Sequence, residues 1–201
     1  GQNGGSYLKT IWKPGAMLAP VPPALVTCGT LEAPNVFTAA WTGIVCTHPA
    51  MTYVSVRPQR YSHSLIEQNG SYVVNLTTAQ LVCAADFCGV RSGRDVDKFE
   101  ACGLTAQASS AVEAPSLAQS PLSIECAVEQ VLRLGSHDMF LARIMAVAVD
   151  PSLIDADGRL CLERAGLAAY AHGSYFELGR RIGTFGFSVR KKPAHKKRRK
   201  K

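Results

Sequence analysis

The sequence predicts a mainly β protein, a β-barrel into which a few short helices are inserted. Three observations support this. Runs rich in Val, Thr, Ile and aromatic residues recur along the chain and indicate about six or seven strands. The helical patterns are short and confined to the region between Tyr61 and Cys102. Strands and helices do not alternate regularly, which argues against a doubly wound parallel sheet.

The strands can be placed in order. The proline-rich stretch from Pro14 to Pro23 predicts an extended lead-in, and residues 24–28 predict a short strand that Gly29 ends. Residues 35–45 are expected to form one strand with a bend or a close backbone approach at Gly43, and 51–57 the next. Residues 71–76, 124–134 and 139–150 predict further strands, the last two joined by a hairpin turn at 135–138.

Short helices are expected at 62–68, from Thr77-Thr78 to about 87, and at 98–102. Ser62 is a candidate N-cap for the first, and Gly70 its terminator. The Ala- and Ser-rich stretch 106–118 suggests a variable surface segment. We divide the chain into a flexible, extended lead-in (1–23), one folded domain (24–189) and a basic, disordered tail (190–201).

The net charge of +7 is a property of the tail. Residues 190–201 hold nine Lys or Arg, which leaves 13 basic against 15 acidic residues in the rest of the chain. A run of like charge is usually solvated, so nucleic-acid binding is not expected except through this tail, which lacks interleaved aromatics. No apolar run approaches a membrane span, and no signal peptide is recognisable. Seven cysteines without a C-x-x-C pair indicate reduced thiols and a cytoplasmic location.

Several reaction classes are excluded because the chain lacks the motifs that are typical of them. The chain has no G-x-G-x-x-G after a strand, no P-loop, no G-x-S-x-G and no H-E-x-x-H. Its five histidines are scattered, so no metal site is predicted.

Three segments carry residues that suit a ligand. In Asn35 to Thr42, small residues beside Trp41 would let a flat ring approach the backbone, although an ordinary strand with a core Trp has the same composition. In Ser55 to His63, Arg57 and Arg60 stand at a strand-to-helix junction, where a phosphate or a solvated loop is equally consistent. In Arg91 to Phe99, a Ser-Gly loop can form an amide nest for an anion, or simply begin a helix.

Five strings occur in the order of a known family: Asn35-x-x-Thr38-x-x-Trp41-Thr42-Gly43, Pro49 to Arg57 with Arg60-Tyr61-Ser62, Tyr72-Val-Val-Asn75-Leu76, Cys88 to Phe99, and Gly135-Ser-His137-Asp138-Met-Phe140. Together, across residues 25–189, the chain resembles the flavin-reductase-like, FMN-binding split β-barrel family, and within it the flavoredoxin-like branch.

The resemblance implies a homodimer with FMN near the subunit interface. It matches His137 to a histidine near the nicotinamide side of reductases, which makes His137 a candidate catalytic residue; a lone histidine in a hairpin is otherwise a surface residue. The residues implied to bind the cofactor are Thr38, Ala39, Ala40, Trp41 and Thr42 along the isoalloxazine, Arg57, Arg60, Tyr61 and Ser62 at the ribityl phosphate, and Asn75, Arg91, Ser92, Gly93 and Lys98 closing the site, together with Asn35 and Ser55. Tyr170 and Tyr175 could border the open face of the flavin, or form an aromatic core.

The activity implied is an NAD(P)H-dependent, flavin-reductase-like oxidoreductase that passes electrons through FMN. A flavoredoxin-type electron carrier, with tightly bound FMN and no direct NAD(P)H activity, is the alternative. A different cofactor in the same fold, such as haem or pyridoxal phosphate, stays open.

Overall fold

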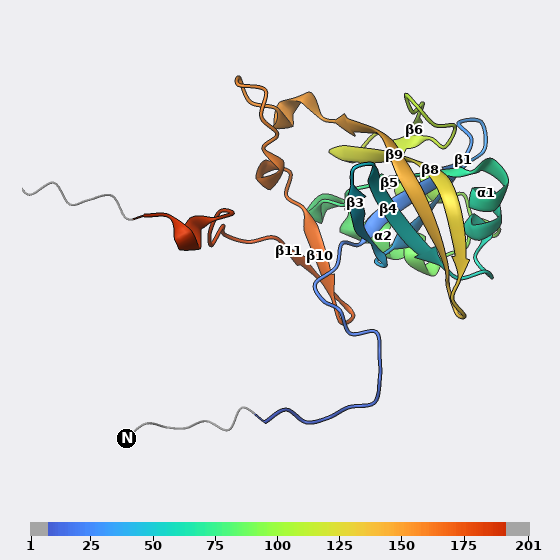
Figure 1. Ribbon diagram of the computed structural model, residues 1–201. Helices are drawn as coiled ribbons and strands as arrows, with labels where there is room; N and C mark the ends of the chain where they lie inside the picture. Colours follow the sequence, from blue (N-terminus) through green and yellow to red (C-terminus); the bar gives the residue numbers. More distant parts are fainter. Residues whose placement is uncertain (1–7, 192–201) are drawn as a thin grey trace, which may run out of the picture.

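One curled antiparallel sheet dominates the fold. The computed structural model describes residues 8–191, and within them the sheet has seven strands. They are β1 (Ala24–Gly29), β2 (Pro34–Ala39), β3 (Thr42–Thr47), β4 (Ala50–Val56), β5 (Ser71–Asn75), β8 (Leu122–Arg133) and β9 (Asp138–Val149). Their order in space is β2-β1-β5-β8-β9-β4-β3 (Figure 1). The expectation of a mainly β fold is confirmed.

Two small antiparallel pairs complete the strands. They are β6 (Ala106–Gln107) with β7 (Ser116–Leu117), and β10 (Ala168–Ala171) with β11 (Ser174–Glu177). The hairpin between β8 and β9 lies where the sequence predicted it, and it pairs Arg133 with Asp138.

The sheet closes into a barrel between β2 and β3. These strands follow one another in the sequence but lie at opposite edges of the sheet. Ala40 and Trp41 join them, and the Trp41 carbonyl accepts a hydrogen bond from the Ser55 amide of β4 at 3.0 Å. The prediction of one strand over residues 35–45 is therefore wrong, whereas the close approach expected at Gly43 is found, since a Cβ atom there would lie 3.2 Å from the Tyr53 ring. The break lies at Ala40-Trp41, because β2 pairs with β1 whereas β3 pairs with β4.

Strand alternation divides the core in two. In β1, Ala24, Val26 and Cys28 face the barrel interior, where they pack with Phe37, Tyr72 and Phe140. Leu25 faces the other side and packs with Val36, Leu81, Phe99 and Leu117. Since both faces of β1 are covered, all six of its residues are buried. The seven cysteines are free thiols, and Cys28 and Cys126 belong to the barrel interior.

Three short α-helices cover the barrel, namely α1 (Tyr61–Asn69), α2 (Val82–Val90) and α3 (Lys98–Cys102). Gly70 ends α1 in the left-handed conformation (φ 67°), as predicted. The N-cap of α1 is Arg60, so the prediction of Ser62 as N-cap is wrong. The prediction that Thr77-Thr78 caps the second helix is met only in part, since Thr78 is the N-cap residue of the turn that leads into α2 but makes no side-chain cap hydrogen bond. The Thr77 hydroxyl donates to the Pro23 carbonyl, and a 3₁₀ turn (Ala79–Leu81) precedes α2.

Further 3₁₀ turns occur at Pro151–Leu153, Leu162–Arg164 and Phe187–Val189. Among residues 8–191, no helix is long and apolar enough to cross a membrane.

The Ala- and Ser-rich stretch 106–118 is anchored, so the prediction of a merely variable surface segment is wrong. Ala114 and Leu117 are fully buried, and Leu117 packs in the core cluster that contains Leu25. The Glu125 carboxylate of β8 is also buried and accepts hydrogen bonds from the Ser110 hydroxyl and the Ala111 amide. The small side chains that suggested exposure instead let the segment lie close against the sheet.

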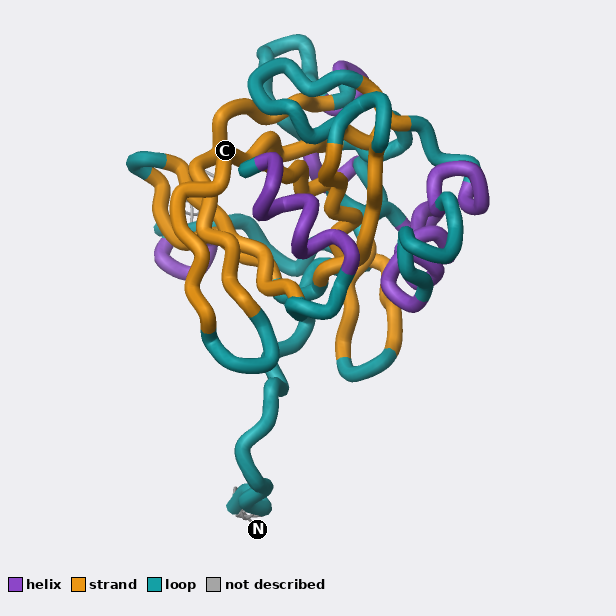
Figure 2. Tube along the Cα trace, turned by 90° about the vertical axis from the view of Figure 1, so that its right-hand side faces the viewer, coloured by secondary structure: helices purple, strands orange, loops and turns teal. Residues whose placement is uncertain are grey.

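The N-terminal segment lies outside the barrel. Residues 8–19 form no helix or strand, and both views show the segment running away from the barrel (Figures 1 and 2). It joins the body at Val21, which exchanges backbone hydrogen bonds with Tyr170 of β10 at 2.8 and 2.9 Å. This bridge fixes the hairpin β10-β11 next to the start of β1.

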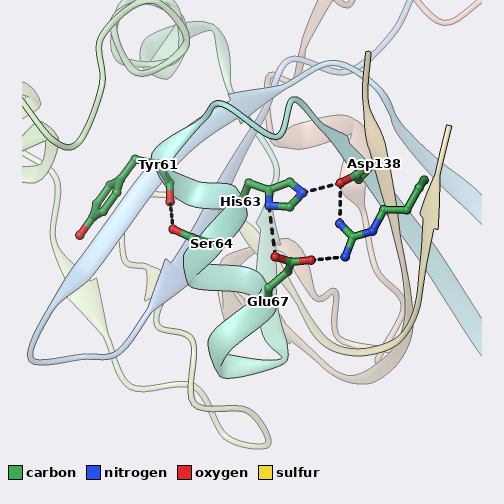
Figure 3. Close-up of polar contacts among 6 residues, drawn as sticks. Tyr61, His63, Ser64, Glu67 and Asp138 are labelled. Carbon is green, nitrogen blue, oxygen red and sulfur yellow. Dashed lines mark hydrogen bonds and ion pairs between the residues drawn. The ribbon is translucent and has the colours of Figure 1, made fainter. Parts of the chain in front are cut away.

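A partly buried ionic network, in which His63 and Asp138 are buried and Glu67 and Arg133 are exposed, fixes α1 to the β8-β9 hairpin. The His63 ring lies 2.7 Å (Nε2 to Oδ2) from the Asp138 carboxylate, and Arg133 Nη1 donates to the same oxygen at 2.6 Å. Arg133 also pairs with Glu67, one helical turn after His63. Figure 3 shows the side chains of His63, Glu67 and Asp138 pointing toward one another. Asp138 is only 4% exposed. Arg133 first, and then His63, hold the pKa of Asp138 below its usual value.

The first prediction concerns this network. Replacing Asp138 by Asn should lower the free energy of unfolding at pH 7 by roughly 1–3 kcal/mol, because charge-assisted hydrogen bonds lose their acceptor. Since the pKa of Asp138 is lower in the folded chain than in the unfolded chain, its contribution is present above the unfolded pKa and is lost as the pH falls through the folded pKa. In denaturant titrations, the difference from the wild type should therefore shrink below about pH 4.

Asp157→Asn is the control, because Asp157 is an exposed carboxylate outside the network. A wild-type minus D138N difference that stays constant from pH 7 to pH 3 would show that the charge of Asp138 does not stabilise the fold.

Candidate functional site

The first part of the site is a cavity of about 360 Å³ at the place where the barrel closes. We call it the aromatic cavity, since Trp41, His137, Tyr170 and Tyr175 line it. Ala39 and Ala40 line it next to Trp41, and their small side chains let a flat ligand approach the backbone there. The cavity is also lined by Pro23, Phe37, Thr38, Ser55, Val56, Arg57, Arg60, Asp86, Gly89 and Val90.

Trp41 and His137 form one wall of the aromatic cavity. Their ring centroids are 4.3 Å apart, with an angle of 42° between the planes. Trp41 remains 44% exposed, so much of its indole is available to a ligand. Burial first, and then the charges of Arg57 and Arg60, lower the pKa of His137, which favours the neutral imidazole.

Another part of the cavity lining joins α2 to the hairpin β10-β11. The Tyr175 hydroxyl donates to the Asp86 carboxylate at 2.9 Å, and Tyr175 packs edge-to-face on Tyr170 at 5.2 Å. Burial and Asp86 raise the pKa of Tyr175 to about 12, so the phenol stays protonated. Asp86 therefore places a carboxylate at this end of the cavity.

The second part of the site is a cavity of about 510 Å³ that we call the cationic cavity. Its charged lining residues are Arg57, Arg60, Arg91, Arg94, Asp95 and Lys98. Arg57, Arg60, Gly89 and Val90 line both cavities, so the two form one continuous groove. The groove is aromatic at one end and strongly basic at the other.

Lys98 is buried beneath the cationic cavity. Its ammonium group donates to the Val36 carbonyl at 2.7 Å and to the Cys88 carbonyl at 3.0 Å. Burial lowers the pKa of Lys98. The charge is thus solvated by backbone dipoles and not by a carboxylate, which leaves it available to attract an anion.

The loop that carries Arg91 and Arg94 packs on the α1 N-terminus through Gly93. A Cβ atom at Gly93 would lie 2.2 Å from Asn35 Oδ1 and 3.0 Å from Tyr61 Cδ1, so only glycine fits. The amides of Asp95 and Val96 bond to the Ser92 carbonyl, and the Arg94 amide bonds to the Ser92 hydroxyl. These amides are therefore used within the loop, and the expected amide nest is not open to a ligand at these three positions.

The structure brings together most of the residues that the sequence singled out. Thr38, Ala39, Ala40, Trp41, Ser55 and His137 line the aromatic cavity, Tyr61, Ser62, Arg91, Ser92, Gly93 and Lys98 the cationic cavity, and Arg57 and Arg60 both. Asn35 lies just behind them. It is buried, its amide donates to the Ser62 hydroxyl at 2.8 Å, and it shares a smaller cavity with Gly93 and Lys98.

Two expectations are not met. Thr42 lies on the far side of Trp41, where its hydroxyl donates to the Tyr53 carbonyl at 2.7 Å. Asn75 is completely buried, and its side chain bonds to the Leu25 carbonyl, the Leu117 amide and the Ser123 hydroxyl. It fastens β7 and β8 to β1 and has no part in either cavity.

Several lining residues were missed by the sequence reasoning, and three of them matter for the geometry of the site. Arg94 follows Arg91 in the same loop, and this spacing could have indicated it. Gly89 lets α2 approach β2, since a Cβ atom there would lie 3.3 Å from Thr38 Cβ. Asp86 gave no signal, because an acidic residue on a short helix is ordinarily a solvated surface group.

Comparisons with known proteins agree with this geometry. The family model described as flavin reductase like domain matches residues 17–179. The structure of flavoredoxin from Desulfovibrio vulgaris (Miyazaki F) is similar, with a TM-score of 0.83 and 27% identity over 91% of this chain and 100% of that chain. The FMN-binding protein of Thermus thermophilus, solved with p-hydroxybenzaldehyde, has a TM-score of 0.74 and 25% identity over 89% and 98%.

The fold is shared more widely. A structure described as a flavin reductase with a split barrel domain, from Shewanella frigidimarina, has a TM-score of 0.74 and 21% identity over 84% of this chain and 87% of that chain. The split barrel expected from the resemblance is thus confirmed, and the family supports a flavin cofactor. Because its model covers most of the described residues, this chain belongs to the flavin reductase like domain family.

Proposed function

We propose that the groove binds FMN and that the chain is an NAD(P)H-dependent, flavin-reductase-like oxidoreductase. One observation carries the proposal: an aromatic cavity and a cationic cavity are continuous through Arg57 and Arg60. FMN has the same two parts, a flat ring system and a phosphate, joined by a polar chain.

The cationic cavity suits the phosphate. Arg57 and Arg60 offer guanidinium groups that can bind phosphate oxygens bidentately. Next to them begins α1, whose N-terminus has no side-chain cap and no acidic residue in its first turn. The free N–H groups and the dipole of a helix start favour an anion at this point.

The aromatic cavity suits the ring. Trp41, Tyr170 and Tyr175 offer apolar surface, while Ala39 and Ala40 leave the backbone accessible. The Thr38 hydroxyl already donates to the Ala85 carbonyl, so only its lone pairs remain to accept a hydrogen bond. A neutral His137 can donate or accept one hydrogen bond beside Trp41.

When bound, FMN supplies a ring system that accepts hydride and passes electrons on. The contribution of the chain is to bind the phosphate, to cover one part of the ring and to leave another part accessible from the His137 side. A flavoredoxin-type electron carrier is the second candidate, and the similarity to the Desulfovibrio flavoredoxin favours it. In that case the same residues hold FMN, but NAD(P)H does not react.

The second prediction tests FMN binding. The purified full chain should bind FMN and be yellow, and Arg60→Gln should raise the dissociation constant roughly 10- to 100-fold, since one charge-assisted contact is lost. Quenching of flavin fluorescence measures the FMN dissociation constant of the wild type and of the variant. Arg164→Gln, an exposed arginine outside the groove, is the control and should change nothing. A colourless protein that takes up no added FMN would refute the proposal.

The same preparation separates the two candidate functions. Anaerobic bleaching of bound FMN by NADH or NADPH supports the reductase, whereas bleaching by dithionite alone supports the electron carrier.

The third prediction concerns His137. Its NMR pKa should lie below about 6.5, and Arg57→Gln should raise it, because removing a positive charge favours protonation. His137→Asn should slow FMN reduction by NAD(P)H while changing the FMN dissociation constant less than Arg60→Gln does. Comparison with the H137N spectrum assigns the resonance. A pKa at or above 6.5 would contradict the described environment.

We also infer that the chain forms a homodimer. Its N-terminal segment exposes Leu8, Ile11 and Leu18 to 85–91%, and its C-terminal segment exposes Ile182 to 91% and leaves Phe185 entirely uncovered. Both segments extend away from the barrel (Figure 1). So many exposed large apolar side chains are costly in water and are expected to be covered by a partner.

The fourth prediction tests the dimer. Light scattering should give twice the chain mass of 21.5 kDa, and Ile11→Asp with Leu18→Asp should shift the protein toward the monomer. Lys9→Asp with Lys13→Asp, which changes charge on the same segment without removing apolar surface, is the control. A wild-type monomer at micromolar concentration would contradict the inference.

A further inference from the structure

Two thiols that the proposed function does not use lie on the helices that flank the cationic loop. Cys88 belongs to the last turn of α2, and Cys102 is the last residue of α3. Both are free thiols. Cys88 is fully buried in the core cluster that contains Leu25 and Phe99, and Cys102 packs against that cluster. Because Cys102 is only half-buried, small molecules in solution can reach its sulfur.

The position of Lys98 indicates that the two thiols face one another. Lys98 and Cys102 are four residues apart in α3, so their side chains lie on the same face of that helix. From this face, the Lys98 ammonium donates to the Cys88 carbonyl at 3.0 Å. The face of α3 that carries Cys102 is therefore turned toward the end of α2 that carries Cys88. In agreement, burial first and then Cys102 raise the pKa of the Cys88 thiol to about 12.

The segment between the two cysteines lines the cationic cavity. It supplies Arg91, Ser92, Gly93 and Arg94 to that cavity. The helix α2 precedes this loop and α3 follows it, so the two thiols stand at its two ends. A covalent bond between the thiols would close a ring that contains the whole loop.

We propose that Cys88 and Cys102 form a reversible disulfide when hydrogen peroxide oxidises the chain, and that this bond clamps the loop at residues 91–97 against the groove. The clamp rests on the proposed function, because it takes the groove to hold the phosphate of FMN. The disulfide itself does not depend on FMN.

The reaction is a two-electron oxidation of the thiol pair, in which the peroxide is reduced to water. The accessible sulfur of Cys102 attacks one peroxide oxygen, the O–O bond breaks, and a sulfenic acid and one water form. The sulfur of Cys88 then attacks the sulfenic sulfur and the S–O bond breaks. The hydroxyl group leaves as a second water with the proton of Cys88. The positive charge of Lys98 favours the Cys88 thiolate, which is the attacking species.

The expected consequence is tighter binding of FMN. A link between the helices that flank the loop removes conformations in which the loop lies away from the groove. Ordering the loop around a phosphate then costs less conformational entropy. We expect the FMN dissociation constant of the oxidised chain to be about three- to tenfold lower than that of the reduced chain.

The first experiment tests the bond. The reduced full chain is treated with hydrogen peroxide, the remaining thiols are blocked, and the tryptic peptides are compared with and without dithiothreitol. Peptide 61–91, which contains Cys88, should be joined to peptide 99–133, which contains Cys102. Dithiothreitol should separate them.

Three variants assign the bond, because the same two peptides also contain Cys83 and Cys126. Cys83→Ser removes the exposed thiol of α2 and is the matched control, in which the peptides should still be joined. In that background, Cys88→Ala and Cys102→Ser should each abolish the joined peptides. Circular dichroism checks that each variant is folded, and Cys102→Ser is the milder change because its site is only half-buried.

The second experiment tests the clamp. Quenching of flavin fluorescence gives the FMN dissociation constant of the Cys83→Ser chain before oxidation, after oxidation and after treatment with dithiothreitol. Oxidation should lower it as stated above, and dithiothreitol should restore it. The chain that also carries Cys102→Ser should show no such change.

Two results would overturn the inference. One is that hydrogen peroxide gives no joined peptides, or joins Cys88 or Cys102 only to Cys28, the other thiol near Lys98. The other is that the bond forms but leaves the FMN dissociation constant unchanged or raises it. Failure of the reduced chain to bind FMN would instead refute the proposed function. Amide hydrogen exchange in residues 91–97, which the clamp should slow on oxidation, would then still decide for or against it.

Discussion

The closure of the barrel at Ala40-Trp41 is the constraint on which the site depends. Because β2 and β3 are joined by two residues, the two edges of a seven-stranded sheet must meet there. The hydrogen bond from the Ser55 amide to the Trp41 carbonyl fixes that meeting point on β4. The backbone beside Trp41 is therefore held open between two edges, and α2, the β8-β9 hairpin and the β10-β11 hairpin can line the space around it.

Charge is distributed in opposite ways on the two sides of α1. On one side, His63 and Glu67 are balanced by Asp138 and Arg133, so the helix is fastened by groups that satisfy one another. On the other side, Arg57 and Arg60 face each other's charge without a carboxylate, and burial together with this repulsion lowers the pKa of Arg60. The network around His63 stabilises the fold by itself. The pair Arg57 and Arg60 is stabilised when an anion binds between them.

Local patterns in the sequence predicted the local structure well. β-branched runs located β1, β4, β5, β8 and β9, and glycine located the end of α1. The break at Ala40-Trp41 could not be predicted in this way, because a strand that changes partner has the same composition as one that continues. The change of partner is a property of the whole sheet, and no short window of sequence contains it.

The same distinction applies to the site. Arg57, Arg60 and Arg91 could be found because basic residues at turns suggest anions, and the order of the motifs supported them. Asn75 was predicted to bind the cofactor because it stands in a family motif. Its side-chain amide instead forms hydrogen bonds with backbone and hydroxyl groups of three strands. Asp86 was missed for the opposite reason, since only the tertiary fold brings the Tyr175 hydroxyl to it.

Gly93 shows how a residue without a side chain can position charge. Its hydrogen atom takes the space in which a Cβ would meet Asn35 and Tyr61, so the loop lies directly on the start of α1. That contact holds Arg94 over Tyr61 and keeps Arg91 at the rim of the same cavity. Bulkier residues at this position would push the loop outward and separate its two arginines from Arg57 and Arg60. The concentration of positive charge in the groove thus depends on close backbone packing as much as on the arginines themselves.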